Sequence, residues 1–182
     1  MILTIINMVV FCDIINFMKL IRIINPENVS EEEVKSYRTR EAGRAVVFDD
    51  DNKVALLHVA NENYYKLPGG GIEEREDKII ALYRECQEEI GCNVEIIKEI
   101  GSIVEYRKIF NLKQTSYCYL VKVKGEKGAP EFTNDEKEKG FEQVWLTYDE
   151  AIKALKESVA TSVEGGEYIV PRDLAFLEES KS

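Results

Sequence analysis

The hydrophobic positions between Ile79 and Ile90 repeat at steps of three and four, which predicts an amphipathic helix with one face packed on a core. A Pro-Gly-Gly-Gly loop precedes this segment, and Gly91 follows it at the position where helices commonly end. The residues expected on the apolar face are Ile79, Leu82, Tyr83, Cys86 and Ile90. We expect the rest of the chain to be organised around this loop and helix.

Apolar runs elsewhere predict strands. Residues 45–48 and 54–59 are two buried strands joined by the acidic turn 49–53, which makes a hairpin. Further strands are predicted at residues 94–97, 101–106 and 144–146. Residues 115–123 alternate without a clearly polar face, which favours a central strand.

Capping signals predict the remaining helices. Ser30 to Glu33 reads as a capping box that opens a short helix ending near Tyr37, and Thr147 to Glu150 opens a helix through Val159. A last helix is expected after Pro171, and the polar residues 125–140 are expected to be a mobile connection. This order of elements favours an α/β fold in which helices enclose a mixed β-sheet.

Composition and charge limit the classes of binding partner. A chain of 182 residues fits one domain, and its formal net charge of −10 argues against a nucleic-acid polymer as partner. A single nucleotide remains compatible, because bound cations can bridge acidic protein and acidic ligand. The cysteines show no CxxC spacing, so we expect reduced thiols and a cytoplasmic location. A homodimer is left open.

The first 24 residues are strongly apolar, but their opening run stops at Asp13, short of the ~20 residues that a membrane span needs. Three interpretations stay open: an extra strand or helix docked on the domain, a membrane-associated anchor, or a true start further along the chain. We favour a start at Met18 and expect no membrane association. Residues 1–38 are then an N-terminal segment with a short helix, and residues 39–182 the main domain.

The helix predicted before Gly91 also carries a stripe of carboxylates. Glu85, Glu88 and Glu89 lie beside the apolar face within about 100° of one another. A hard cation such as Mg²⁺ would be bound by these carboxylates and would offset their mutual repulsion. Arg84 could hold one carboxylate in place. The alternative is a solvated acidic face, but such a face needs no triple-glycine loop before it.

The residues from Gly70 to Cys92 resemble the Nudix box of the Nudix (MutT-like) hydrolases. Gly70, Glu76, Arg84-Glu85, Glu88-Glu89 and Gly91 stand at the spacing of that signature, while Cys86 and Cys92 replace its usual aliphatic residues. The resemblance covers roughly residues 39–159 and rests chiefly on this box. It implies the Nudix α/β/α sandwich and hydrolysis of a nucleoside diphosphate linked to another group with Mg²⁺ or Mn²⁺.

The resemblance also implies roles for single residues. Glu85, Glu88 and Glu89 would bind metal or deprotonate water, Arg84 would orient a glutamate, and the Gly70 carbonyl would be a further metal ligand. Nudix enzymes often supply one more glutamate from a later loop, for which Glu138 is preferred over Glu136.

Candidate substrate contacts lie beside the box. They are Tyr64, Tyr65, Lys66, Gly69, Gly70 and Gly71. The two tyrosines offer flat faces for a base, with a place in the core as an equal alternative. Residues 107–113 are basic, and a solvated loop is favoured there over a phosphate contact. His58, the only histidine, is expected to be structural.

The preferred substrate is a nucleoside triphosphate, including oxidised purine forms, cleaved to monophosphate and pyrophosphate. ADP-ribose or a nucleotide sugar is the alternative, although the proline typical of ADP-ribose-specific Nudix members is missing between Cys92 and Pro130. A non-catalytic nucleotide sensor and a Nudix-fold isomerase are weaker alternatives, because no box carboxylate is lost and no catalytic cysteine motif precedes the box.

Overall fold

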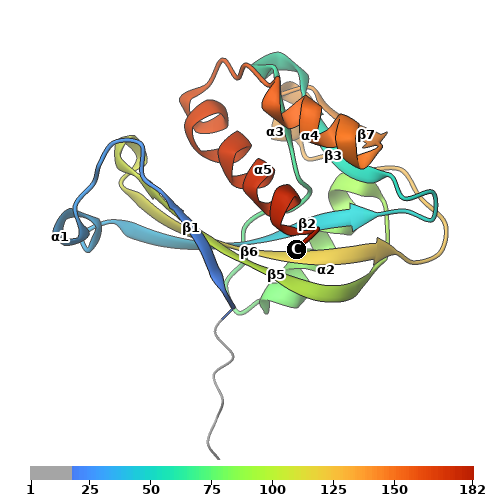
Figure 1. Ribbon diagram of the computed structural model, residues 1–182, viewed down its shortest axis with the longest axis horizontal. Helices are drawn as coiled ribbons and strands as arrows, with labels where there is room; N and C mark the ends of the chain where they lie inside the picture. The colour runs from blue at the N-terminus through green and yellow to red at the C-terminus, as the bar shows by residue number, and fades with distance from the viewer. Residues whose placement is uncertain (1–17) are drawn as a thin grey trace, which may run out of the picture.

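A computed structural model describes residues 18–182 (Figure 1). Its strands are β1 (Leu20–Ile24), β2 (Arg38–Phe48), β3 (Val54–Val59), β4 (Tyr64–Lys66), β5 (Val94–Arg107), β6 (Leu112–Val123) and β7 (Phe141–Leu146). Its helices are α1 (Glu31–Val34), α2 (Lys78–Ile90), α3 (Asn134–Glu138), α4 (Tyr148–Lys156) and α5 (Val170–Glu179). The 3₁₀ turns η1 (Ala60–Glu62) and η2 (Lys108–Phe110) and the π-helical turn η3 (Glu164–Ile169) complete the chain.

The strands form one mixed sheet in the order β1-β5-β6-β2-β3-β4, with β7 paired to β3. Strands β5 and β6 are antiparallel neighbours joined by η2, whereas β6 runs parallel to β2 over the full length of β2. Strand β2 therefore lies in the middle of the sheet and meets both the long hairpin and the β3–β4–β7 group. The expected mixed sheet is confirmed.

Helices cover both faces of this sheet (Figure 1). Side chains of β2 alternate between the two cores: Val46 packs with α4 and α5, while Ala45 and Val47 pack with α2. Both cores consist of fully or nearly fully buried apolar residues, which is what drives a sheet and its covering helices together. The α/β class expected from the order of elements is thus confirmed.

Several elements differ from the prediction. Strand β2 begins at Arg38 rather than at residue 45, α4 ends at Lys156 rather than at Val159, and β4 was not predicted. Residues 94–107 form one strand rather than two, because register shifts around Ile97 and Ile100 let β5 bend without ending. The connection predicted to be mobile contains α3, whose first turn is closed by a capping box between Thr133 and Glu136. Helix α1 ends at Val34, earlier than expected, although Ser30 caps it as predicted.

Part of the N-terminal segment belongs to the sheet. Residues 20–24 form β1, which pairs in parallel with β5, so an extra docked strand describes this part of the segment. The questions of an anchor and of a start at Met18 concern residues 1–17, which lie outside the described residues. Within residues 18–182, no helix is both long enough and apolar enough to span a membrane.

Candidate active site

The glycine loop lies along the central strand β2. The Gly70 carbonyl accepts a hydrogen bond from the Gly43 N–H at 3.0 Å, and the Pro68 carbonyl accepts one from the Ala45 N–H at 3.0 Å. Residues 72–77 separate the loop from the start of α2, so the loop does not lead directly into the helix. These bonds to the middle of the sheet give the loop a fixed position.

The C-terminal helix holds the start of the same loop. The Asp173 carboxylate accepts a hydrogen bond of 2.9 Å from the Leu67 N–H, and both residues are fully buried. Asp173 also accepts a bond of 2.7 Å from Arg172. Helix α5 therefore helps to position the loop. The sequence does not reveal this role, because α5 and the loop are far apart along the chain.

Two of the glycines are required by close contacts. Gly69 has φ +132°, and a Cβ there would lie 2.2 Å from the Gly43 carbonyl oxygen. A Cβ on Gly70 would lie 2.2 Å from a carboxylate oxygen of Glu85. The missing side chain of Gly70 thus lets Glu85 approach the loop, which explains why glycine stands there.

We predict that Gly70→Ala lowers turnover at least tenfold while the protein stays folded, because only the flexible end of Glu85 has to move. Gly69→Ala is the contrasting variant, since its Cβ would strike backbone and its φ disfavours any side chain. Turnover and thermal denaturation of both variants check this prediction. Unchanged turnover in Gly70→Ala would show that the position of Glu85 is unimportant.

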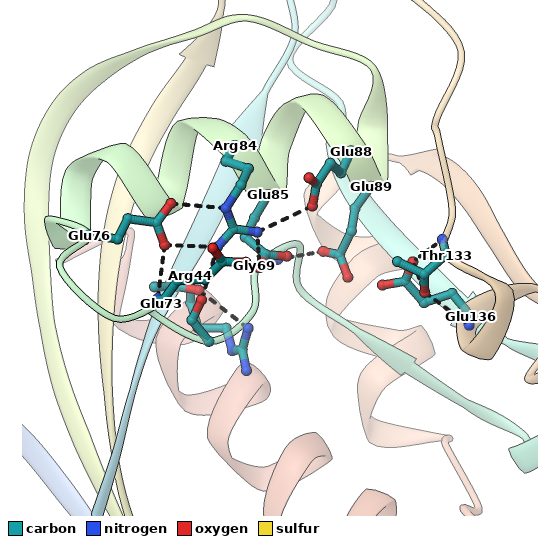
Figure 2. Close-up of polar contacts among 12 residues, drawn as sticks. Arg44, Gly69, Glu73, Glu76, Arg84, Glu85, Glu88, Glu89, Thr133 and Glu136 are labelled. Atoms are coloured by element: carbon teal, nitrogen blue, oxygen red, sulfur yellow. Dashed lines mark hydrogen bonds and ion pairs between the residues drawn. The ribbon is translucent and has the colours of Figure 1, made fainter.

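Helix α2 forms as predicted, except that Tyr83, expected on the core-packed face, is 42% exposed. Asp77 caps its N-terminus by accepting a hydrogen bond from the Ile79 N–H, and Gly91 ends it in the left-handed conformation with φ +61°. Leu82, Cys86 and Ile90 are buried on the sheet side. This orientation turns Glu85 and Glu89 towards the glycine loop, as Figure 2 shows.

Arg84 links the carboxylates of this region (Figure 2). Its guanidinium donates two hydrogen bonds of 2.9 Å to Glu76, one of 2.8 Å to Glu85 and one of 3.2 Å to Glu88. A fourth acceptor is the Gly71 carbonyl at 3.0 Å. The bonds to Glu76 are the main reason that the pKa of Arg84 lies above its usual value. Arg84 fixes Glu85 relative to the loop, as a planar fork of donors can.

Glu89 is the most buried carboxylate of the stripe, with 2% of its surface exposed. It accepts hydrogen bonds of 2.5 Å from the Lys66 ammonium and 2.5 Å from the Gly69 N–H. Burial raises the pKa of Glu89 above its usual value; Lys66 opposes the shift and the nearby charge of Glu85 adds to it. Lys66, a predicted substrate contact, therefore partners a carboxylate of the site.

The donor types fit a hard divalent cation. Glu85 and Glu89 stand next to each other at the glycine loop, and their charges repel. Among residues 18–182, however, no three acidic, histidine or cysteine side chains converge as a ready metal cage. Mg²⁺ does not demand one, because it commonly takes one or two carboxylates and keeps several waters. Gly70 could contribute through the second lone pair of its carbonyl.

A cleft of about 280 Å³ opens beside these residues. It is lined by Gly69, Gly70, Gly71, Glu85, Glu89, Tyr64 and Lys66 among the predicted residues, and the structure thereby brings them together. Glu88 is the more exposed partner of Arg84 and lies outside this lining.

Other candidates lie elsewhere. Tyr65 stacks on His58 with ring centroids 4.6 Å apart, away from the cleft, so the structure gives no support to Tyr65 as a base-stacking residue. Glu136, and not the preferred Glu138, lines the cleft. Its carboxylate caps α3 by accepting from the Thr133 N–H at 2.7 Å (Figure 2). In the basic segment, Arg107 is buried at the end of β5, whereas residues 108–111 form the exposed turn that joins β5 to β6, in agreement with the predicted solvated loop.

Sequence reasoning missed the basic side of the cleft. Arg40 and Arg44 come from β2, Arg172 from α5 and Lys139 from the segment after α3. An arginine inside the apolar run Ala42–Phe48 is the signal that could have found Arg44, because charged residues are rarely buried without purpose. The site therefore has an acidic wall on α2 and a basic wall on β2 and α5.

The α/β fold and the carboxylates of α2 indicate the class of protein, and a comparison with known families identifies the family. The family model described as the NUDIX domain matches residues 38–164, and the chain belongs to this family. The expected family is thus confirmed.

Curated relatives share part of the chain. An RNA pyrophosphohydrolase of Pelagibacter ubique is 40% identical over 70 residues, which are 37% of this chain and 44% of the relative. An RNA pyrophosphohydrolase of Sulfurovum sp. is 41% identical over 73 residues, 35% of this chain and 46% of the relative. The matched region therefore spans less than half the length of these relatives.

Solved structures agree on the fold. The ORF135 protein of E. coli aligns with a TM-score of 0.56 at 20% identity, over 81% of this chain and 91% of that one. A NUDIX hydrolase from Nitrosomonas europaea aligns with a TM-score of 0.60 at 16% identity, over 79% and 89%. At such identities the likeness concerns the architecture only.

Proposed function

We propose that this protein is a pyrophosphohydrolase that cleaves a phosphoric anhydride of a nucleotide with the help of a divalent cation. The single observation that carries the proposal is the placement of Glu85 and Glu89 against the backbone of the glycine loop, with Arg84 holding Glu85. Membership of the Nudix family supports the same reaction class.

The proposed roles follow from these contacts. Glu85 and Glu89 would hold Mg²⁺ or Mn²⁺, with the Gly70 carbonyl as a further ligand. Bound there, the cation would neutralise phosphate oxygens and lower the pKa of a bound water. Arg84 keeps Glu85 in position. The Lys66 ammonium donates to Glu89 and lies where it can donate to a phosphate oxygen of the substrate instead. Glu88, Glu89 and Glu136 are the candidates for the general base.

The substrate we favour carries a 5′-triphosphate, as in a nucleoside triphosphate, and the products are a monophosphate and pyrophosphate. The 5′-triphosphate end of an RNA is a second candidate, which the names of the curated relatives favour. The net charge of −10 argues against extensive contacts with a polymer, but an RNA end needs only the cleft. ADP-ribose and nucleotide sugars remain the less favoured alternative.

A substrate panel tests this proposal. It contains a nucleoside triphosphate, an oxidised purine triphosphate, a short RNA with a 5′-triphosphate, ADP-ribose and a nucleotide sugar, each with and without Mg²⁺. We expect cation-dependent release of pyrophosphate from at least one triphosphate substrate. Absence of anhydride cleavage on every member, with Mg²⁺ or Mn²⁺ present, would contradict the proposal and favour a nucleotide sensor.

A further inference from the structure

Arg44 is a buried cation without a carboxylate partner among the described residues. Only 5% of its surface is exposed, yet its one side-chain hydrogen bond goes to the neighbouring Gly43 carbonyl at 3.2 Å, and its Nε–H has none. Burial lowers the pKa of Arg44 to about 10, which still leaves it charged at neutral pH. The charges of Asp173, Glu89 and Glu85 favour the charged form of Arg44, but none of these carboxylates bonds to it. A buried charge without a bonded counterion costs folding free energy, so its presence needs a reason.

The neighbouring buried arginines differ in this respect. Arg107 bonds to Glu105 at 2.9 Å and to Glu164 at 2.6 Å. Arg172, which is fully buried, pairs with Asp173 at 2.7 Å. The fold therefore supplies counterions where arginines serve the packing of α5 on the sheet. Among residues 18–182 it places no carboxylate at ion-pair distance from Arg44.

Three guanidinium groups meet at the cleft. Arg40 and Arg44 line it from β2 and Arg172 from α5. The Nη1 atom of Arg172 is also buried without a hydrogen bond in the described part of the chain, and its charge adds to the lowering of the pKa of Arg44. Arg40 bonds to Gln114 at 3.0 Å, and its fork lies beside the glycine loop. Glu164 also lines the cleft, but its carboxylate is paired with Arg107 at 2.6 Å, so the three guanidinium groups still favour an anion between them.

We propose that Arg44, together with Arg40 and Arg172, binds the terminal phosphate group of the substrate on the basic wall of the cleft. This inference rests on the proposed function, because it places the far end of the phosphate chain opposite the acidic wall of α2. A terminal phosphate has three free oxygens and about two negative charges, which suits a guanidinium fork. Each phosphate of ADP-ribose is linked on both sides, by an ester and by the anhydride, and has fewer free oxygens and less negative charge. Arg44 thus selects phosphate-terminated over sugar-terminated substrates.

The test compares three proteins: wild type, Arg44→Met and Arg38→Met. Arg38 is an exposed arginine of the same strand, so Arg38→Met controls for the substitution itself. Calorimetric titration with inorganic pyrophosphate, with and without Mg²⁺, measures the phosphate site. Thermal denaturation measures the fold, and KM for a nucleoside triphosphate and for ADP-ribose measures selection.

We expect Arg44→Met to bind pyrophosphate about 10- to 100-fold more weakly, the loss expected for hydrogen bonds to a charged group. Its Tm should equal or exceed that of wild type, because an unpaired buried charge has been removed. KM should rise for the triphosphate and change little for ADP-ribose. Arg38→Met should behave as wild type in every measurement.

Unchanged pyrophosphate binding in Arg44→Met would overturn the inference, and so would an equal rise in KM for both substrates. Should Arg44→Met fail to fold, Arg44→Lys keeps the charge without the fork, and its binding of pyrophosphate must be weaker. If wild type cleaves no anhydride but binds pyrophosphate through Arg44, the proposed hydrolysis fails while the phosphate site stands. If wild type cleaves the anhydride and Arg44→Met does so with an unaltered KM, the phosphate site fails while the proposed hydrolysis stands.

Discussion

Replacing Glu89 by glutamine is expected to reduce turnover by about 10²- to 10⁴-fold, the range that a well-placed acid–base or cation-binding group contributes. Glutamine keeps the shape of the side chain and removes its charge, so both the attraction for a cation and the capacity to accept a proton are lost. Steady-state kinetics at saturating Mg²⁺ measures the effect. Near-normal turnover would refute the assignment of Glu89 to the catalytic site.

The fold should tolerate this change. Burial raises the pKa of Glu89, which means that the interior disfavours its charged form and that a neutral replacement is acceptable there. Lys66 would lose its partner, and the double variant Lys66→Met/Glu89→Gln removes that penalty. Glu74→Gln, an exposed residue of the segment before α2, is the control and should keep full turnover and stability.

Replacing Arg172 by methionine is expected to lower the free energy of unfolding by about 3–5 kcal/mol, the usual cost of removing one partner from a buried ion pair. Asp173 and Glu105 would be left buried with less compensation, and Asp173 is the residue that holds the start of the glycine loop. Urea denaturation followed by circular dichroism measures the loss. Turnover should fall as well, since the loop positions Glu85.

Arg44 and Arg172 should differ in their effect on stability. Both residues are buried arginines of the same cleft, but only Arg172 has carboxylate partners at bonding distance in residues 18–182. Arg172→Met should therefore be much less stable than Arg44→Met. Equal stability of the two variants would show that the ion pairs of Arg172 contribute nothing to the packing of α5.

The helix of the site was predictable because its information is local. The three- and four-residue steps of α2, the cap at Asp77 and the stop at Gly91 all lie within fifteen residues, and together they place Glu85 and Glu89 on one side. The glycine loop was predictable as a close-approach loop, although sequence does not reveal that Gly70 makes room for Glu85 in particular.

The basic wall was not predictable because its contacts are distant in sequence. Leu67 and Asp173 are 106 residues apart, and Arg44 meets Arg172 only after α5 has packed on the sheet. Helix α3 is a different case, since the capping signal from Thr133 to Glu136 was readable. The polar composition around it indicated a loop, and the local hydrogen bonds prevailed over composition.

The central claim is that the carboxylates of α2 hold a cation which in turn holds the phosphate chain. A crystal of the protein with Mn²⁺ and a non-hydrolysable nucleoside triphosphate, examined by anomalous scattering, tests this claim most directly. We predict a manganese peak in contact with oxygens of Glu85 and Glu89 and with the bound phosphates. A nucleotide bound in the cleft with no manganese at these two side chains, or a nucleotide bound elsewhere, would contradict it.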